Sequence, residues 1–264
     1  MDEKVILLWT GGWDSTFRLL QLVEDTKATI QPLYLVDEIR GSTPREIDTM
    51  RSIRAMIKKR WPDSQERLLP TDYGSYRATE MEPHHREMWE TLRERGRVGL
   101  QYPILASYAE QNGIDRMELS VEARSNSEST VIQVLEPLLE PGGTASDSVH
   151  ILPKTVGAPE ALFCAFEFPL LGYTKQDMKK ESERRQWMHI MNETWFCFDP
   201  TFGLPCGSCQ PCKIAQKEGM KSRVGYLGPL LCSSRRQVRS SRRQAVALLE
   251  KAGLKSKVKS MLGY

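Results

Sequence analysis

Four cysteines lie close together in the run CFDPTFGLPCGSCQPC, with the spacing Cys197-x8-Cys206-x2-Cys209-x2-Cys212. Thiolate sulfur is a ligand for zinc, and structural zinc sites are closed by four such ligands in a tetrahedral shell. The glycine and prolines among the cysteines suit the tight turns of a zinc knuckle. The pattern therefore predicts a structural zinc site formed by these four residues.

Two other uses of the four cysteines stay open. Disulfides are disfavoured because nothing marks the chain as secreted; the start MDEKVILLWTGG is expected to be a strand and not a signal peptide. An iron–sulfur cluster also takes four thiolates, and spacing alone does not exclude it. Outside the cluster, Cys164 lies in an apolar run and is expected in the core. Cys232, beside serines and arginines, could have a lowered thiol pKa.

A glycine loop is the second feature that could support chemistry. Residues 5–9 form an apolar run of strand length, and from Asp14 onward apolar residues recur at helical spacing. Between them, Gly11 and Gly12 allow a close backbone approach to a ligand. Backbone N–H groups and the helix dipole at such a junction favour an anion. The order of strand, loop and helix predicts a nucleotide-binding loop over residues 10–16.

Polar side chains in this loop add to the prediction. Hydroxyl groups of Thr10, Ser15 and Thr16 are hydrogen-bond donors, and Asp14 could hold Mg²⁺ or start the helix. The loop is neither a Walker motif nor a Gly-x-Gly-x-x-Gly fingerprint. An ordinary turn between a strand and a helix is the alternative.

Alternating strand and helix patterns predict an α/β fold with a doubly wound, mostly parallel sheet. Strands are expected at residues 5–9, 29–36, 66–69, 116–121 and 149–152, with an extended segment at 166–171. One helix is expected to begin at residue 14, and others are expected over residues 43–61, 102–111, 130–139 and 174–187. Residues 71–96 are expected to form a loop and a solvated helix.

Some element ends carry specific signals. Thr43, Pro44 and Glu46 predict an N-cap, a first helical position and a capping box. Adjacent histidines point in different directions on a helix, so we expect His84 and His85 at the surface and not on a shared metal.

Composition limits the class of protein. The chain has 264 residues, 40% of them hydrophobic, and a net charge of +3, which is ordinary for a globular protein. We expect no membrane span, and the clustered cysteines favour a reducing, cytoplasmic location. Residues 213–264 carry 13 Lys and Arg against two Glu, a net charge of +11. This basic tail is expected either as a solvated end or as a contact for RNA or an acidic protein. Two domains are expected, over residues 1–190 and 191–264.

The order of the motifs resembles one known family. The Gly-Gly-Trp-Asp-Ser loop is similar to the pyrophosphate loop (PP-loop) of ATP pyrophosphatases. The runs FEFPLLGYTKQDM, NETWFCF and CGSCQPCKIA follow it in the order found in 7-cyano-7-deazaguanine synthases. The resemblance covers both ends of the chain and is poor in the middle.

This resemblance implies an adenine nucleotide alpha-hydrolase-like, Rossmann-type fold that binds ATP, Mg²⁺ and a structural Zn²⁺, and a tendency to form homodimers. It implies adenylation of the carboxylate of 7-carboxy-7-deazaguanine, a step of queuosine biosynthesis, and its conversion by ammonia to an amide and a nitrile. Asp14 and Ser15 would be catalytic. The implied ATP contacts are Trp9, Thr10, Gly11, Gly12, Trp13, Asp14, Ser15, Thr16, Leu35 and Val36.

The middle of the chain departs from the family. Residues 98–101 read Val-Gly-Leu-Gln where the family has Pro-Gly-Arg-Asn, so Arg97 or Arg95 would have to replace the arginine. The expected substrate contacts are Arg97, Gly99, Gln101 and Glu122. Three alternatives follow: conjugation of a deazaguanine to a protein or peptide amine, tRNA thiolation, and a zinc-containing binding module without catalysis.

Overall fold

A computed structural model describes residues 3–123, 135–145 and 148–233. The chain divides into two units, Met1–Trp195 and Phe196–Tyr264, whereas the sequence predicted a boundary after residue 190. Among the helices of the described residues, none combines the length and the apolar character that a membrane crossing requires.

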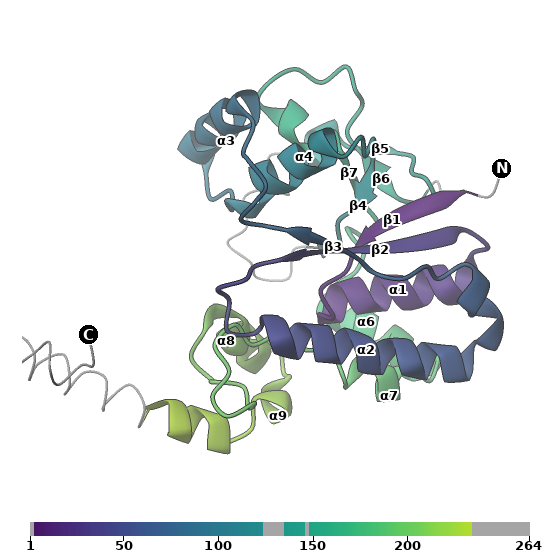
Figure 1. Cartoon of the computed structure of the whole chain (residues 1–264), viewed down its shortest axis with the longest axis vertical. Helices are drawn as coiled ribbons and strands as arrows, with labels where there is room; N and C mark the ends of the chain where they lie inside the picture. Colours follow the sequence, from purple (N-terminus) through teal and green to yellow (C-terminus); the bar gives the residue numbers. More distant parts are fainter. Residues whose placement is uncertain (1–2, 124–134, 146–147, 234–264) are drawn as a thin grey trace, which may run out of the picture. The chain divides into compact units, whose positions relative to one another are not determined.

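The first unit is built on a seven-stranded sheet with the order β3-β2-β1-β4-β7-β6-β5 (Figure 1). Its strands are β1 (Lys4–Leu8), β2 (Thr29–Val36), β3 (Asp72–Ser75), β4 (Met117–Glu118), β5 (Glu140–Pro141), β6 (His150–Ile151) and β7 (Phe166–Phe168). Pairing is parallel from β3 to β7, and the β7-β6 and β6-β5 pairs are antiparallel. The predicted α/β class and mostly parallel sheet are confirmed.

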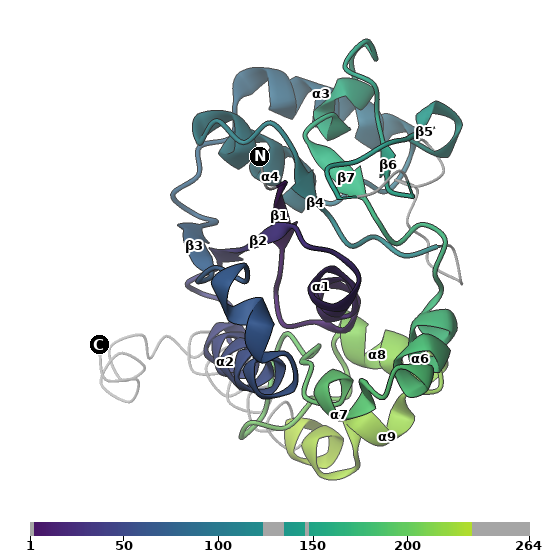
Figure 2. The same ribbon diagram turned by 90° about the vertical axis from the view of Figure 1, so that its right-hand side faces the viewer.

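Helices cover both faces of this sheet (Figures 1 and 2). One face carries α1 (Trp13–Asp25), α2 (Thr43–Arg60), α6 (Lys175–Arg184) and α7 (Met188–Met191), and the other carries α3 (Pro83–Arg95) and α4 (Gln101–Gln111). Short 3-10 helices occupy Pro62–Glu66, Glu136–Leu138 and Glu160–Phe163.

The apolar side chains of each helix explain these layers. Phe17 of α1 is fully buried, and its ring centroid lies 5.4 Å from that of Tyr173 and 5.7 Å from that of Trp187. On the opposite face, Tyr102 of α4 packs on Phe163 at 5.2 Å. Each aromatic side chain removes a large apolar area from water, so these contacts hold α1 against the segments that precede α6 and α7, and α4 against the 3-10 helix at Glu160–Phe163.

The third strand lies later than predicted. Residues 66–69 contribute only a single bridge, between Leu68 and Ile30, and β3 begins at Asp72 in the segment expected to be a loop. Pro70 separates the two, and a proline has no N–H group to donate to the strand ladder. The ladder therefore resumes only after it.

The start of α2 also differs. Ser42 is the N-cap and Thr43 is the first helical residue, whose hydroxyl donates to the Asp37 carbonyl at 2.7 Å. Glu46 does not close a capping box. Its buried carboxylate accepts hydrogen bonds from the Tyr34 hydroxyl at 2.5 Å and the Ser42 hydroxyl at 2.6 Å. A buried carboxylate needs such donors, and this need overrides the local capping pattern.

Other predicted ends shift by a few residues. The helix starting after Thr174 has its predicted capping box with Asp177, but it ends at Arg184 and not at Trp187. Gln186 follows with φ 59°, a left-handed conformation that interrupts the helix before α7. The strand expected at 116–121 is only two residues long. Of the helix expected at 130–139, residues 130–134 lie outside the described ones, and Glu136–Leu138 is a 3-10 turn.

The second unit contains α8 (Gln210–Lys217) and α9 (Lys221–Val224), which pack on each other. Most of the basic tail, residues 234–264, lies outside the described residues.

Candidate functional site

The loop between β1 and α1 turns without room for side chains at its glycines. Gly11 has φ +69°, and a Cβ there would lie 3.1 Å from Thr49 Cγ2 and 3.2 Å from Met50 Cγ of α2. The Gly11 carbonyl accepts a hydrogen bond from the Trp195 N–H at 2.9 Å. The loop is therefore held from two sides in a conformation that favours glycine.

Two of the predicted ATP contacts, Trp9 and Thr16, have side chains that bond to each other within the core. Trp9 and Thr16 are both fully buried, and the Trp9 indole N–H donates to the Thr16 hydroxyl at 3.1 Å. The Thr10 N–H donates to the Ser15 hydroxyl at 3.4 Å, which closes the loop over the start of α1. The N-cap residue of α1, Gly12, makes no side-chain cap, and the start of this helix faces the glycine loop with its positive dipole end.

Two predicted site residues meet a third that the sequence did not single out as functional. Lys175 Nζ lies 3.1 Å and 3.2 Å from the two carboxylate oxygens of Asp14, and 2.7 Å from Glu122 Oε1. The three side chains are 29%, 17% and 15% exposed for Asp14, Glu122 and Lys175. We call these residues the acid–lysine cluster.

Three neighbouring strands position this cluster at their carboxyl ends. Asp14 follows β1, Glu122 follows β4, and Lys175 follows β7 as the first residue of α6. The Ala123 N–H donates to the Tyr173 carbonyl at 2.9 Å, which ties the segment after β4 to the segment before α6. In doubly wound sheets, ligands bind at the carboxyl edge where the strand order reverses, here between β1 and β4.

A buried ion pair supports the same region from within. Arg18 of α1 donates to both oxygens of Glu118 in β4, at 2.7 Å from Nε and 2.6 Å from Nη2. Burial raises the pKa of Glu118, and the Arg18 guanidinium opposes this shift. The pair fixes α1 against β4 four residues before Glu122, so it helps to set the distance between Asp14 and Glu122.

Other residues predicted to contact ATP or the substrate belong to β2 and to the segment at the start of α4. Leu35 and Val36 pair with β3 and extend beyond the last β1–β2 pair, Leu8 with Leu33. Arg97, Gly99 and Gln101 are exposed before and at the start of α4. Arg95 forms an ion pair with Glu160 at 2.6 Å. The acid–lysine cluster forms without this segment.

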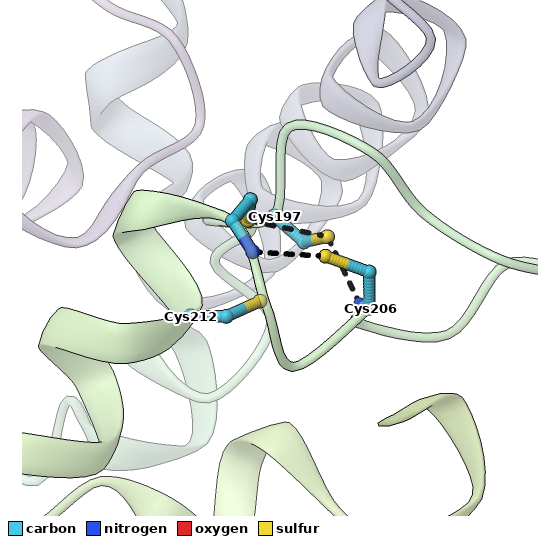
Figure 3. A group of neighbouring side chains, drawn as sticks. Cys197, Cys206 and Cys212 are labelled. Carbon is cyan, nitrogen blue, oxygen red and sulfur yellow. Dashed lines mark hydrogen bonds between the residues drawn. The ribbon is translucent and has the colours of Figure 1, made fainter. Parts of the chain in front are cut away.

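The four clustered cysteines converge as predicted, in the second unit. Their sulfurs all lie within 4.8 Å of one another, and Cys197 and Cys209 are 3.9 Å apart. Figure 3 shows the side chains of Cys197, Cys206 and Cys212 pointing toward one another. A tetrahedral zinc site with Zn–S bonds of about 2.3 Å has sulfurs about 3.8 Å apart, so the group fits zinc.

Backbone geometry prepares this site. The Ser208 and Cys209 N–H groups donate to Cys206 Sγ at 3.5 Å and 3.3 Å, and the Cys206 N–H donates to Cys197 Sγ at 3.2 Å. Such bonds stabilise thiolates. Gly207 has φ +73°, and a Cβ there would lie 2.4 Å from Pro229 Cγ. A glycine is required at this turn by both conformation and space.

The thiols of the group shift one another's pKa. Hydrogen bonding with the Cys197 and Cys212 thiols lowers the pKa of Cys209 well below its ordinary value, and hydrogen bonding with Cys209 raises the pKa of Cys197. All six cysteines lie among the described residues, and none forms a disulfide. The disulfide alternative is therefore wrong, whereas sulfur geometry alone does not separate zinc from an iron–sulfur cluster.

The two remaining cysteines do not resemble reactive thiols. Cys164 is half-buried, its Sγ lies 3.6 Å from the Pro153 carbonyl, and burial raises its pKa. Cys232 is 4% exposed, with its Sγ 3.6 Å from the Ser208 hydroxyl.

Comparison with known proteins adds no relative: neither a scan against protein families nor a search of curated proteins gave a match.

Lys175 is a candidate site residue that sequence reasoning missed. Its signal was the capping box from Thr174 to Asp177, which places residue 175 at the first position of a helix that follows a buried strand.

Proposed function

We propose that this protein is an ATP-dependent, AMP-forming ligase that adenylates a carboxylate for attack by a nitrogen nucleophile. The observation that supports this proposal most is the acid–lysine cluster, in which Lys175 joins Asp14 to Glu122 beside the glycine loop. Its position at the β1–β4 edge is where a nucleotide binds in sheets of this topology.

Each part of the cluster has a role in this proposal. The loop over residues 10–16 would hold the pyrophosphate at the N-terminus of α1, and Lys175 would neutralise charge on the phosphates. Asp14 would hold Mg²⁺, whose chemical contribution is to neutralise charge on phosphate oxygens. Because two carboxylates face one lysine, the cluster favours a cation together with an anionic ligand.

The reaction balances as a substitution at phosphorus followed by one at carbon. A carboxylate oxygen attacks the α-phosphorus of ATP, which gives an acyl-adenylate and releases pyrophosphate. An amine then attacks the acyl carbon, and AMP leaves with its oxygen while the amine loses a proton. Catalysis would depend mainly on positioning and charge neutralisation, since no covalent intermediate with the protein is needed.

Two nucleophiles are considered for 7-carboxy-7-deazaguanine as the carboxylate. Ammonia would give an amide, and a second activation at the amide oxygen would give the nitrile. A protein or peptide amine would give a conjugate, and the altered segment around Gly99 and the basic tail would then bind the acceptor. Zinc on the four cysteines would be structural, because a full shell of four thiolates leaves no open position.

The thiolating alternative is less well supported. Thiolation requires a reactive sulfur, whereas Cys164 is half-buried with a raised pKa and Cys232 is buried.

Mass spectrometry of the products tests the proposal. The protein is incubated with ATP, Mg²⁺, 7-carboxy-7-deazaguanine and ammonium, and Asp14→Asn serves as the impaired variant. We expect AMP and the nitrile from wild type. AMP that forms only when a protein acceptor is added would favour conjugation, and ADP or no nucleotide product would refute the adenylation.

A further inference from the structure

The geometry points to a second metal site, formed by His84, His85 and Glu110, that takes a divalent transition ion such as Zn²⁺ or Co²⁺. It lies on the α3 and α4 side of the first unit and does not depend on the acid–lysine cluster or the four cysteines. The sequence prediction that the two histidines diverge is wrong, because their ring centroids are only 4.1 Å apart.

Three potential ligand atoms converge at this place. His84 Nε2 lies 3.0 Å and His85 Nε2 lies 3.6 Å from the same oxygen, Glu110 Oε2. One ligand atom from each residue lies within 4.8 Å of the other two. With metal–ligand bonds of about 2.0–2.2 Å, tetrahedral ligand atoms lie about 3.4 Å apart. The existing separations bracket that distance, so binding needs only small side-chain movements.

A buried hydroxyl fixes which nitrogen of His85 is available. Ser107 is fully buried and donates its hydroxyl hydrogen to the Pro103 carbonyl at 2.7 Å. Its oxygen therefore accepts from the Glu82 N–H at 3.0 Å and from His85 Nδ1 at 3.0 Å. The neutral His85 ring thus carries its hydrogen on Nδ1 and directs the Nε2 lone pair at the Glu110 carboxylate.

This arrangement favours a cation between the two groups. A lone pair and a carboxylate oxygen at 3.6 Å repel each other unless a proton or a metal lies between them. Orientation of a ligating histidine by a hydrogen bond at its other nitrogen is a general feature of metal sites. The C-terminal end of α4, which carries Glu110, also favours positive charge, while the N-terminus of α3 opposes it.

The ligand set selects the class of metal. Imidazole nitrogens suit zinc, cobalt, nickel and copper, whereas Mg²⁺ and Ca²⁺ prefer oxygen. His84 and Glu110 are 47% and 52% exposed, so solvent can supply the remaining ligands. Two histidines and one carboxylate with an open position form an exchangeable site, weaker than the closed shell of four thiolates.

A cobalt titration of the full chain tests the site. Metal held outside the four cysteines is first removed with a mild chelator, and Co²⁺ is then added while absorption spectra and bound cobalt are measured. We expect one further equivalent of Co²⁺ with visible bands but without the strong thiolate-to-cobalt bands. His85→Ala and Glu110→Gln should each weaken this binding by at least about tenfold, and Ser107→Ala by about 10–100-fold.

Two controls make the result specific. His189→Ala removes another exposed histidine from the same unit and should leave cobalt binding unchanged. Cys209→Ser should reduce zinc retention and leave the second equivalent intact. The proposal fails if wild type takes up no equivalent beyond the four-cysteine site. It also fails if the variants at residues 85 and 110 bind cobalt as wild type does.

Discussion

Three side chains far apart in the sequence form the centre of the proposed active site. Asp14 and Lys175 are separated by 161 positions, and Glu122 by 53 from Lys175, yet Lys175 Nζ lies within hydrogen-bonding distance of both carboxylates. Asp14 could be predicted because it belongs to a local motif. Lys175 could not be assigned a partner, because its contacts depend on the order of β1, β4 and β7 in the sheet.

Removal of the lysine should weaken nucleotide binding. Lys175→Met removes the ammonium group that pairs with both Asp14 and Glu122, a charged donor worth about 1.5–3 kcal/mol. We expect ATP affinity to fall about 10–100-fold in calorimetry. Lys179→Met on the same helix removes an exposed lysine, 3.8 Å from Glu183, and should leave the ATP affinity unchanged. Equal affinities for wild type and Lys175→Met would contradict the assigned role.

The cysteine turn can be tested at one glycine. Gly207→Ala adds a Cβ 2.4 Å from Pro229 Cγ at φ +73°, whereas Gly219→Ala adds one at φ +79° with nothing within 4 Å. Both variants carry left-handed strain of about 1–2 kcal/mol, but only the first adds a clash of about 1–3 kcal/mol. Zinc retention during dialysis should therefore fall for Gly207→Ala only. Similar retention by both variants would show that the turn tolerates the clash.

At the scale of elements, local signals succeed where packing agrees with them. The predicted bounds of β2, residues 29–36, match the structure at both ends, and the predicted capping box at Thr174 is present. Predictions fail where a distant partner decides, as at Glu46, whose carboxylate binds Tyr34 and not the helix start. The shortness of β4 has a similar cause, because its length is set by its pairing with β1 and β7 and not by the local sequence pattern.

Breaking the ion pair between α1 and β4 should destabilise the fold strongly, because it leaves a buried carboxylate without its partner. Arg18→Met leaves the fully buried Glu118 carboxylate without its bidentate partner, and we expect a loss of about 3–5 kcal/mol in the free energy of unfolding by urea. The exposed pair of Arg51 with Asp48 gives the control, where Arg51→Met should cost less than about 1 kcal/mol. A similar loss of unfolding free energy in both variants would contradict the role of Arg18 as the partner of a buried carboxylate.

The stability of the Arg18→Met variant should depend on pH, in the direction given by the pKa shift of Glu118. Burial raises the pKa of Glu118 above its ordinary 4.5, Arg18 opposes this, and Glu167 adds to it. A raised pKa in the folded state means that the cost of ionising Glu118 is present above that pKa and absent below 4.5. The gap in unfolding free energy between wild type and Arg18→Met should narrow as the pH falls toward 4.5. A difference in unfolding free energy that does not depend on pH would contradict the role assigned to the buried Glu118 carboxylate.

At the scale of the whole molecule, the chain consists of an α/β unit with a mostly parallel sheet and a short unit that contains the four clustered cysteines. The sequence predicted both, because each has a local signature. The predicted homodimer, the cytoplasmic location and the acceptor for the basic tail stay predictions, since they depend on other molecules.

Metal removal should unfold the second unit and leave the sheet of the first unit folded. In the described part of the second unit, residues 196–233, the helices are short and few side chains other than the cysteines are buried, so metal binding should provide most of the folding energy. After treatment with a strong chelator, hydrogen exchange should show that amides of α8 lose protection while those of β2 keep it. Protection of α8 that survives complete loss of metal would show that the cysteines are not a structural metal site.

The central claim is that the protein forms an acyl-adenylate, and pyrophosphate exchange tests it most directly. Labelled pyrophosphate is incubated with the protein, ATP, Mg²⁺ and 7-carboxy-7-deazaguanine without a nitrogen nucleophile, and label in ATP is measured. We predict label in ATP that depends on the carboxylate and is lost in Asp14→Asn and Lys175→Met. Absence of exchange with wild-type protein that binds ATP, or exchange that is independent of the carboxylate, would contradict the claim.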